Sequence, residues 1–439
     1  MTIAQGIKRL GLPIAAILGV VLAALASLSL LLDRDGLRRA VETQIRAVTG
    51  LDLVVNGGID ITVFPQSRVV FHDVGLKDGG AADAALKVDT LVANLRLLPL
   101  LLQRFQIADV VLIQPRIRVV RQADGGSNWT PFINTLTRTV KPDAENPLSF
   151  SEIRIQDGIL TYTDAAGRTE TVRDINLSLA WPSISRSFAA TGRFDWRGAR
   201  VDGSVSVNDF IAALAGERSG LKVRVAAPSL KLAFDGAVAN KTSLMMDGTL
   251  TADSGSLRNA MRWLGQAPPG QGGFGRFALK ARANLVGPSL ALTNVNVELD
   301  GNAAEGVMTY SNIGRQTLQA TLAAGALDFT PYVSTFRWLT SGARDWNRQL
   351  FDLSALSATD LDIRLSAAKV AVGSTKLGRT ALGANLRGGT LALSVAEAQI
   401  FGGIAKGSLG VARDDLKADV KAQFQLADVD LQSSASELF

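Results

Sequence analysis

The sequence predicts a mainly β protein: an N-terminal transmembrane helix followed by an elongated, curved antiparallel β-sheet or groove with a few short α-helices. Two observations carry this prediction. A long uncharged apolar run near the N-terminus is typical of a membrane-spanning helix. Beyond it, apolar and polar residues alternate with a period of two over much of the chain, which is typical of half-buried strands.

The apolar run covers residues 10–32 and contains no charged side chain. At about 1.5 Å per residue, a helix of this length crosses a hydrocarbon core of about 30 Å and satisfies its own backbone hydrogen bonds there. A cleaved signal peptide is the alternative, because Ala24-Leu25-Ala26 resembles a cleavage site. The run continues through Leu32 after that site, which favours a retained anchor with residues 1–9 as a short cytoplasmic N-terminus.

The composition excludes several kinds of chemistry. The 439 residues contain no cysteine and one histidine, so disulfides, thiolate catalysis and a two-histidine metal site are excluded. The formal net charge of +6 comes from scattered residues and not from a basic block, so no nucleic acid partner is expected. We expect no catalytic, metal or cofactor site, although a pair of carboxylates stays open as a route to hydrolysis.

One glycine-rich stretch matches a cofactor motif by its letters alone. Residues 270–275 fit G-x-G-x-x-G, which in a dinucleotide site lies between a strand and a helix. Here Pro268 and Pro269 precede the stretch and a strand-like segment follows it. The stretch is therefore predicted to be a loop.

After the anchor, an amphipathic helix is predicted over residues 37–48, where apolar residues recur every three or four positions. Short strands separated by turn signals then follow from Asp52 to Arg121. At the end of this series, Arg116, Arg118 and Arg121 interleave with apolar residues, which predicts one apolar and one basic strand face.

This N-terminal region resembles the AsmA family. The resemblance rests on features in one order and at matching distances: Phe64-Pro65, the strand at Asp73-Val74, the apolar turn around Pro99, Pro115, and the ending Gly126-Ser127-Asn128-Trp129. It implies that residues 33–130 form an AsmA-like N-terminal region, similar to chorein domains. Three prolines among polar residues then predict a linker over residues 131–149.

Residues 150–439 are predicted to form a β-rich repeat region, with helical interruptions at Ser256–Leu264 and Pro331–Leu350. The first interruption stops at Gly265. Short alternating segments separated by turn residues fill the rest of the region. Because each such unit needs a neighbour to cover its apolar face, they predict an elongated β array.

The later half of the chain repeats itself. The segments Asn284–Leu292 and Asn385–Leu393 share the pattern N-L-x-G-x-x-L-A-L, 101 residues apart. The apolar positions change parity in both copies, after Leu292 in the first and after Val395 in the second. A change of this kind predicts a β-bulge that bends the strand.

The resemblance to the AsmA family extends into this region, through the strand Leu361–Leu365 and the triplet Phe401-Gly402-Gly403. It implies a bacterial inner-membrane protein with a single span, whose main body lies in the periplasm and takes part in outer-membrane biogenesis. It also implies a groove like that of chorein-type bridge lipid transporters. Family members commonly continue with a further β-rich block beyond the point matching Leu431, so we expect a short member or an incomplete chain.

The implied mechanism is passive: an apolar sheet face shields phospholipid acyl chains while the headgroups stay in water. The expected partners are the membrane, phospholipids, and envelope or outer-membrane proteins. The same apolar positions also suit a closed core, and the alternative function is a non-enzymatic scaffold that assists outer-membrane protein assembly through exposed strand edges. The predicted groove residues are Val223, Val225, Leu230, Leu232, Leu290, Leu292, Leu391 and Leu393.

Overall fold

The computed structural model describes residues 52–62, 67–77, 84–96, 107–122, 126–139, 152–180, 187–268, 272–333, 359–414 and 417–430. The predicted transmembrane helix at 10–32, the amphipathic helix at 37–48 and most of the predicted helix at 331–350 lie outside these residues. Within the described ranges, no helix is both long and apolar enough to cross a membrane. The membrane anchor therefore stays a prediction.

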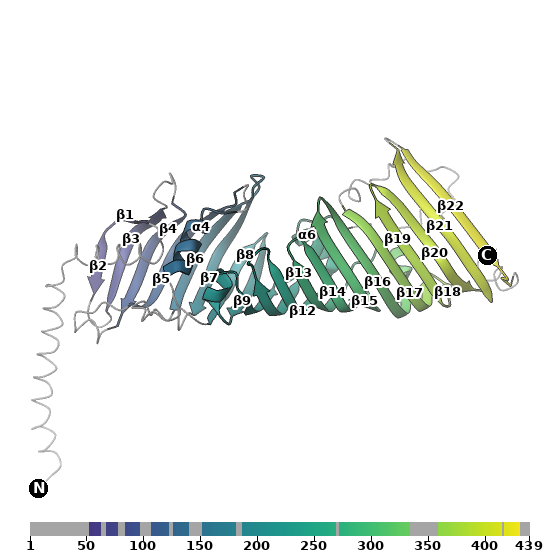
Figure 1. The fold of residues 1–439 in the computed structure, drawn as a ribbon, viewed down its shortest axis with the longest axis horizontal. Helices are drawn as coiled ribbons and strands as arrows, with labels where there is room; N and C mark the ends of the chain where they lie inside the picture. Colours follow the sequence, from purple (N-terminus) through teal and green to yellow (C-terminus); the bar gives the residue numbers. More distant parts are fainter. Residues whose placement is uncertain are drawn as a thin grey trace, which may run out of the picture. The chain divides into compact units, whose positions relative to one another are not determined.

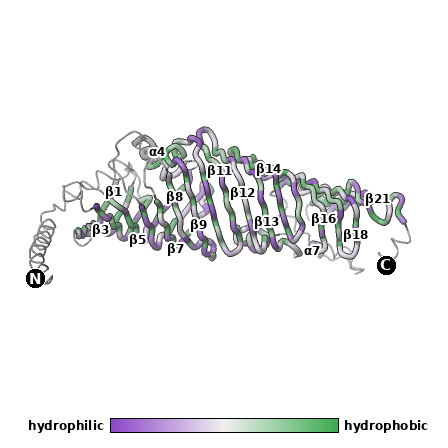
Figure 2. The backbone as a smooth tube through the Cα atoms, turned by 90° about the horizontal axis from the view of Figure 1, so that it is seen from below, coloured by the Kyte–Doolittle hydropathy of each residue, from purple (hydrophilic) through white to green (hydrophobic). Residues whose placement is uncertain are grey.

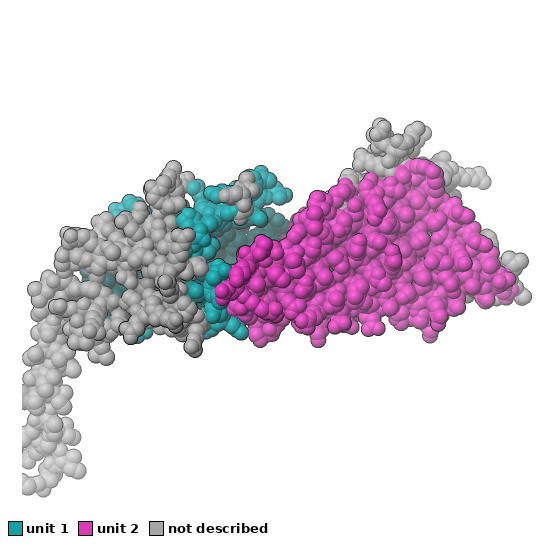
Figure 3. All heavy atoms as spheres, viewed as in Figure 1, with its two compact units in different colours: residues 1–215 teal, residues 216–439 magenta. Residues whose placement is uncertain are grey.

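The chain divides into two compact units, residues 1–215 and residues 216–439 (Figure 3). Each unit consists of strands that lie side by side, with a few short helices in the connections (Figure 1). The prediction of a mainly β fold with few helices is confirmed.

In the first unit, the strands follow one another in the sheet nearly in sequence order. The short strands β1 and β2 both pair with β3, and the later strands are then added one at a time. Among the pairings described in this unit, that of β5 with β6 is parallel and the others are antiparallel. The strands are β1 Asp52–Val55, β2 Ile59–Thr62, β3 Arg68–Lys77, β4 Leu86–Leu95, β5 Ile107–Val120, β6 Glu152–Thr163, β7 Thr169–Ala180, β8 Phe188–Trp196 and β9 Ala199–Val207.

Among its described residues, this unit has two short helices. Helix α4 (Thr130–Thr139) lies in the connection between β5 and β6, and α5 (Phe210–Leu214) follows β9. Two parallel strands need a crossover connection, commonly a helix, which explains why a helix forms here. The first part of the predicted linker 131–149 is therefore helical, and residues 140–149 lie outside the described residues.

The core of the first unit lies on one face of β1, β3 and β4. Val69, Phe71 and Val74 are each only 1% exposed, and Val88 on the neighbouring strand is 2% exposed. Trp129, just ahead of α4, packs against this cluster from outside the sheet. The start of α4 therefore covers the apolar face of the first strands.

Single left-handed residues keep the apolar side chains of this unit on one face. Phe71 and Val74 are three residues apart and would face opposite ways in a regular strand. Asp73 between them has a φ of 50°, and this local kink turns Val74 back toward the core. Gln114 on β5 and Asp157 on β6 adopt the same conformation, with φ of 52°.

The segment around Asn128 completes the edge of β5 beyond the end of β4. Asn128 Nδ2 donates a hydrogen bond to the Arg118 carbonyl oxygen at 2.8 Å, and the Val120 amide donates to Asn128 Oδ1 at 2.9 Å. Trp129 Nε1 donates to the same Arg118 carbonyl at 2.9 Å. The Asn128 side chain thus replaces a neighbouring strand, which explains the sequence Gly126-Ser127-Asn128-Trp129 in structural terms.

Replacing Asn128 with alanine is expected to lower the free energy of unfolding by about 2 kcal/mol, because the part-buried Val120 amide loses its acceptor and the Arg118 carbonyl loses one of its two donors. Urea denaturation of the full chain in detergent measures the change. The matched control is Asn312→Ala, whose exposed side chain lies near a hairpin turn and should change stability by less than about 0.5 kcal/mol. Equal effects of the two changes would contradict the strand-replacing role of Asn128.

The second unit continues the same design. Antiparallel hairpins run from β10 to β16, β16 pairs with β17 in parallel, and β17 pairs with both β18 and β19. Antiparallel pairing then continues to β22. The strands are β10 Ser219–Ala226, β11 Lys231–Ala239, β12 Met245–Ser254, β13 Phe277–Val286, β14 Ser289–Leu299, β15 Asn302–Ile313, β16 Arg315–Asp328, β17 Thr359–Val372, β18 Thr375–Leu377, β19 Thr380–Arg387, β20 Thr390–Ile400, β21 Gly403–Asp414 and β22 Lys417–Ala427.

Helix α6 (Leu257–Trp263) confirms the helix predicted at Ser256–Leu264. Ser256 is its N-cap, and the side chain of that residue accepts a hydrogen bond from the Asn259 amide. The helix ends before Gly265, which has a φ of 80° as expected for a residue just past a helix. Of the second predicted helix, the structure describes the short helix α7 (Thr330–Val333).

The sequence repeat corresponds to two equivalent hairpins, β13–β14 and β19–β20. Gly287 and Gly388 occupy the same turn position, with φ of 55° and 59°. The register of β14 against β15 shifts between Leu292 and Val295, and that of β20 against β21 shifts between Val395 and Ala398. Both predicted β-bulges are therefore confirmed.

Candidate functional site

Apolar side chains of neighbouring strands share one face of the second unit. Val223 lies opposite Phe234, Phe234 opposite Leu250, and Leu250 opposite Ala281. Because directly opposed residues of paired strands point to the same side, these four side chains form one row across β10 to β13. Figure 2 shows the alternation of apolar and polar residues along the strands that produces this face.

The row continues through the later strands. Leu322 on β16 lies beside Leu365 on β17, Leu365 lies opposite Leu382 on β19, and Leu382 lies opposite Val395 on β20. Val395 in turn lies opposite Gly407 on β21. We call this continuous surface the apolar face of the second unit.

Seven of the eight predicted groove residues lie on strands with their side chains on this face. They differ in exposure. Leu292 is 8% exposed and belongs to a buried cluster with Val295, which has no exposed surface. Leu393 is half-buried and lines a groove. The seven residues are Val223, Val225, Leu232, Leu290, Leu292, Leu391 and Leu393.

The eighth residue, Leu230, lies just before β11, which begins at Lys231. The Ala227 amide donates to its carbonyl oxygen at 2.8 Å, and its own amide donates to the Ala227 carbonyl oxygen at 3.3 Å. Leu230 therefore lies in the turn between β10 and β11, and its place in the groove stays a prediction.

The opposite face of the second unit is polar. Lys222 and Asp235 form an ion pair with an N–O distance of 3.0 Å between β10 and β11, and Arg282 and Asp247 form one at 2.8 Å between β12 and β13. These pairs are exposed, so they contribute little to stability. The sheet thus separates a wet side from an apolar side.

Over β17 to β22, the apolar face is hollowed into a groove with a volume of about 420 Å³. Phe329, which follows β16, lies at one border of the groove, and Phe424 on β22 lies at another. The remaining large side chains of the groove are Ile363, Leu365, Leu382, Leu393, Val395 and Leu409. The apolar face is thus packed tightly over β13 and β14 but open over these later strands.

A second hollow, of about 780 Å³, extends over β16 to β22 and shares the side chains of Ile363, Leu365, Leu382, Leu393 and Leu409 with the groove. Its small residues include Ala381, Gly383, Ala392 and Gly410, whose positions alternate with those of the apolar face. Asn385, Ser394, Ser408, Arg364 and Lys421 add polar groups to the lining. The lining of this hollow therefore combines apolar and polar side chains.

Strand β22 carries exposed apolar side chains. Val420 is 46% exposed, Phe424 is 73% exposed and Leu426 is 65% exposed, and all three alternate along one side of the strand. Within the described residues, β22 pairs with β21 along one edge. In the part of the chain that the structure describes, the apolar side chains of β22 are therefore exposed beside the last described strand backbone.

Two facing glycines bring β11 and β12 close together on the apolar face. Gly236 lies opposite Gly248. A Cβ atom added to Gly236 would lie 2.2 Å from the Asp247 carbonyl oxygen and 2.6 Å from the Cα atom of Gly248. The close approach of these strands therefore requires glycine.

The glycine-rich loop predicted from the sequence is held in place, as far as the structure describes it. Arg258 Nη2 donates to the carbonyl oxygen of Gly272 at 2.8 Å, and the Asp300 carboxylate accepts hydrogen bonds from the amides of Phe274 and Gly275 at 2.8 Å and 2.7 Å. The Tyr332 hydroxyl also donates to Asp300, and burial together with this carboxylate raises the pKa of that hydroxyl. A dinucleotide-binding loop is followed by a helix, whereas this loop is followed by strand β13.

The side chains that commonly bind metal ions are not clustered within the described residues. In the described part of the chain, no group of three or more histidine, aspartate or glutamate side chains could hold a metal ion. His72 Nε2 lies 3.1 Å from Asp60 Oδ2 in an exposed pair. This contact links β2 and β3 at the surface.

A carboxylate in the first unit is strongly stabilised in its charged form. Arg154 Nη2 donates to Glu152 Oε2 at 2.7 Å, and Ser178 Oγ donates to Glu152 Oε1 at 2.6 Å. The hydrogen bond from Arg154, and after it the one from Ser178, lower the pKa of Glu152 from 4.5 to about 2. The interaction joins the start of β6 to β7.

Glu152 is expected to stabilise this pairing fully above pH 4.5, and the contribution is expected to fade as the pH falls toward about 2. The sign follows because the folded state binds the proton more weakly than the unfolded state. Urea denaturation of the wild-type chain and of Glu152→Gln, repeated across this pH range, measures the difference between them. A difference that does not change with pH would contradict this role for the carboxylate.

These features define a class of protein: an open, mostly antiparallel β-sheet protein whose second unit has one apolar and one polar face. The model of the AsmA family matches residues 7–247, more than half of the chain, and the chain belongs to this family. It is similar to Protein AsmA of Escherichia coli strain K12, with 26% identity over 205 residues. That match covers 44% of this chain and 33% of the relative, so it spans about a third of the relative's length.

No solved structure matches the chain significantly. Membership of the AsmA family confirms the resemblance described from the sequence. It associates the chain with the bacterial envelope and suggests a role related to outer-membrane biogenesis.

Proposed function

We propose that this protein is anchored in the inner membrane, with its body in the periplasm, and that it holds or passes phospholipid acyl chains along the apolar faces of its sheet. It does so without catalysis. The observation that carries the proposal is the register of apolar side chains across β10 to β22, which joins them into one uninterrupted surface. Burial of alkyl chains is a chemistry that would use the whole of such a surface.

The energetics of burial allow an acyl chain to be held on the apolar face and also to slide along it. Each buried CH₂ group contributes about 0.8 kcal/mol, so a single acyl chain is retained firmly. Neighbouring strands repeat every 4.7 to 4.9 Å or so and present similar apolar side chains, so a chain moving from one strand to the next exchanges like contacts. The open groove of about 420 Å³ over β17 to β22 leaves a path by which a chain can enter from the side.

Photo-crosslinking in cells tests the proposal, with a probe placed in turn at Leu393 and Ala392. Leu393 lines the groove, whereas Ala392 is exposed on the opposite face, so the two neighbours form a matched pair. Lipid adducts are expected at Leu393 and not at Ala392. Equal lipid labelling at both positions, or lipid labelling at neither, would overturn the proposal.

A second candidate function is a scaffold for outer-membrane protein assembly, and the exposed apolar side chains of β22 favour it. An extended segment of a client protein could pair with this strand, with Phe424 and Leu426 packing against its side chains. A photo-crosslinking probe at Gln423, on the polar side of this strand, distinguishes the two functions. Protein adducts there, without lipid adducts at Leu393, would favour the scaffold.

A further inference from the structure

Three successive rows of side chains cross one end of the sheet in the first unit, and their chemistry changes from row to row. The first row is apolar: Ile117 lies beside Leu160, Leu160 opposite Val172, and Val172 opposite Trp196. Because alternate residues of a strand share a face, each following row lies about 6.6 Å further along the strands on the same side.

The second row holds Val119, Tyr162 and Glu170, which are neighbours in the pairing of β5, β6 and β7. Glu170 accepts a hydrogen bond from Trp196 Nε1 at 3.3 Å and forms an ion pair with Arg197. The Arg197 guanidinium also lies over the Trp196 ring, 4.8 Å from its centre. This row is therefore amphipathic, and the N–H of the Trp196 ring points toward the end of the strands.

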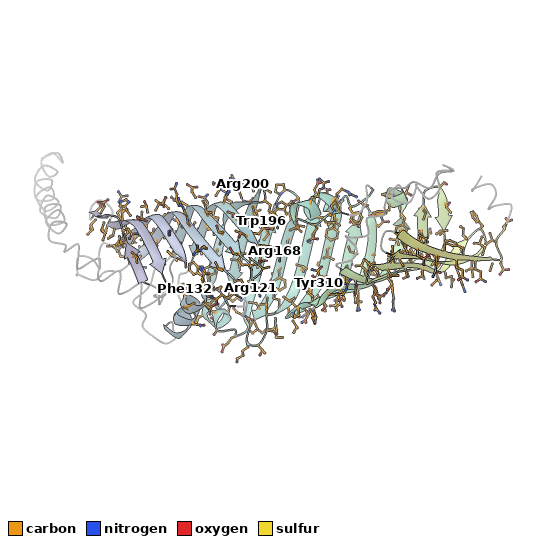
Figure 4. The ribbon with its side chains drawn as sticks, turned by 90° about the horizontal axis from the view of Figure 1, so that it is seen from above. Arg121, Phe132, Arg168, Trp196, Arg200 and Tyr310 are labelled. Atoms are coloured by element: carbon orange, nitrogen blue, oxygen red, sulfur yellow. The ribbon has the colours of Figure 1, made fainter. Side chains whose placement is uncertain are left out.

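The third row is charged, with two arginines, Arg121 and Arg168, and one carboxylate, Asp164, so its net charge is +1. Arg121 follows Val119 by two residues, and its amide donates to the Thr163 carbonyl oxygen at 2.9 Å, next to Asp164. The Asp164 carboxylate accepts hydrogen bonds from Arg168 Nε and from the Arg168 amide, both at 2.8 Å. In the described part of the chain, no ion pair joins Arg121 to a carboxylate. Figure 4 labels Arg121, Arg168, Trp196 and Arg200 at this end of the unit.

The order apolar, aromatic, basic is the order of groups in a phospholipid, from acyl chain through glycerol to phosphate. Tyrosine and tryptophan rings favour the boundary between apolar and wet surroundings, and arginine pairs well with phosphate oxygens. We propose that Arg121 and Arg168 bind the phosphate of a phospholipid whose acyl chains lie on the apolar rows of the first unit, with Tyr162 and Trp196 at the level of the glycerol. This inference rests on the proposed function and adds to it the group by which the lipid is recognised.

The test uses the purified full chain in detergent and two tail-labelled probes with the same acyl chains, phosphatidylglycerol and diacylglycerol. The double variant Arg121→Gln with Arg168→Gln is expected to retain phosphatidylglycerol on the order of tenfold less well than the wild type. Its retention of diacylglycerol should be unchanged, which also shows that the variant is folded. The matched control is Arg200→Gln, because Arg200 lies at the same end of the sheet but on the opposite face, paired with Asp195 at 3.0 Å.

The outcomes separate this inference from the proposed function. If the double variant retains phosphatidylglycerol as well as the wild type does, while both probes still bind, the phosphate site is wrong and the proposed function stands. If the wild type retains neither probe, both are wrong. Excess glycerol 3-phosphate is expected to leave phosphatidylglycerol bound, and displacement would assign the site to a soluble phosphate compound and overturn the lipid assignment.

Discussion

Replacing Gly236 with alanine is expected to destabilise the second unit by about 3 kcal/mol or more. The added methyl group would overlap the Asp247 carbonyl oxygen at 2.2 Å and the Cα atom of Gly248 at 2.6 Å, and both are backbone atoms of the neighbouring strand. A flexible side chain could move aside, but relief here would require β11 and β12 to separate. Thermal and urea denaturation of the full chain in detergent measure the loss.

The control for this change is Gly325→Ala on β16. An alanine Cβ there meets no atom within 4 Å, so stability should change by less than about 1 kcal/mol, in the stabilising direction if at all. Comparable losses from the two changes would contradict the contact between the strands as the cause of the effect.

Replacing Phe71 with alanine is expected to reduce the stability of the first unit by about 4 kcal/mol. Phe71 is 1% exposed and packs among Val69, Val74 and Val88, so truncation leaves a cavity in the densest part of that core. Urea denaturation, together with loss of hydrogen-exchange protection in β3 and β4, checks the result.

The same truncation at an exposed position provides the comparison. Phe424 is 73% exposed on β22, so Phe424→Ala should change the free energy of unfolding by less than about 0.5 kcal/mol. A loss at Phe71 no larger than the loss at Phe424 would contradict the placement of Phe71 in a closed core.

The faces of the sheet could be predicted from the sequence because alternation of side chains is itself the signal. The parity change after Leu292 predicted a bulge, and the register shift between Leu292 and Val295 confirms it. The parallel pairings were not predicted, since alternation along a strand says nothing about the direction of its neighbour. The start of β11 was predicted one residue early, at Leu230, because a turn residue can continue the pattern of the strand that follows it.

The three rows of side chains in the first unit could not be predicted from the sequence, because they depend on the register between strands. The sequence grouped Arg121 with Arg116 and Arg118 as one basic face, but Arg121 shares the parity of Val119 and so lies on the apolar side. Its neighbours there, Asp164 and Arg168, come from the next hairpin and are brought beside it by the parallel register of β5 and β6. The parity of Arg121 in the sequence already indicates its place on the apolar face. The register of β5 with β6, which sets its neighbours, is known only from the structure.

The two parallel pairings also bear on how the chain folds. A hairpin such as β13–β14 joins residues that are close in sequence, so it closes a short loop and can form soon after those residues are synthesised. The pairs β5–β6 and β16–β17 can form only after the long segment that connects their two strands has been synthesised. Closing this longer loop also costs more entropy. In each unit, the hairpins on either side of the parallel pair are therefore expected to form rapidly. The parallel pairing is expected to form slowly and to limit the rate at which the unit folds.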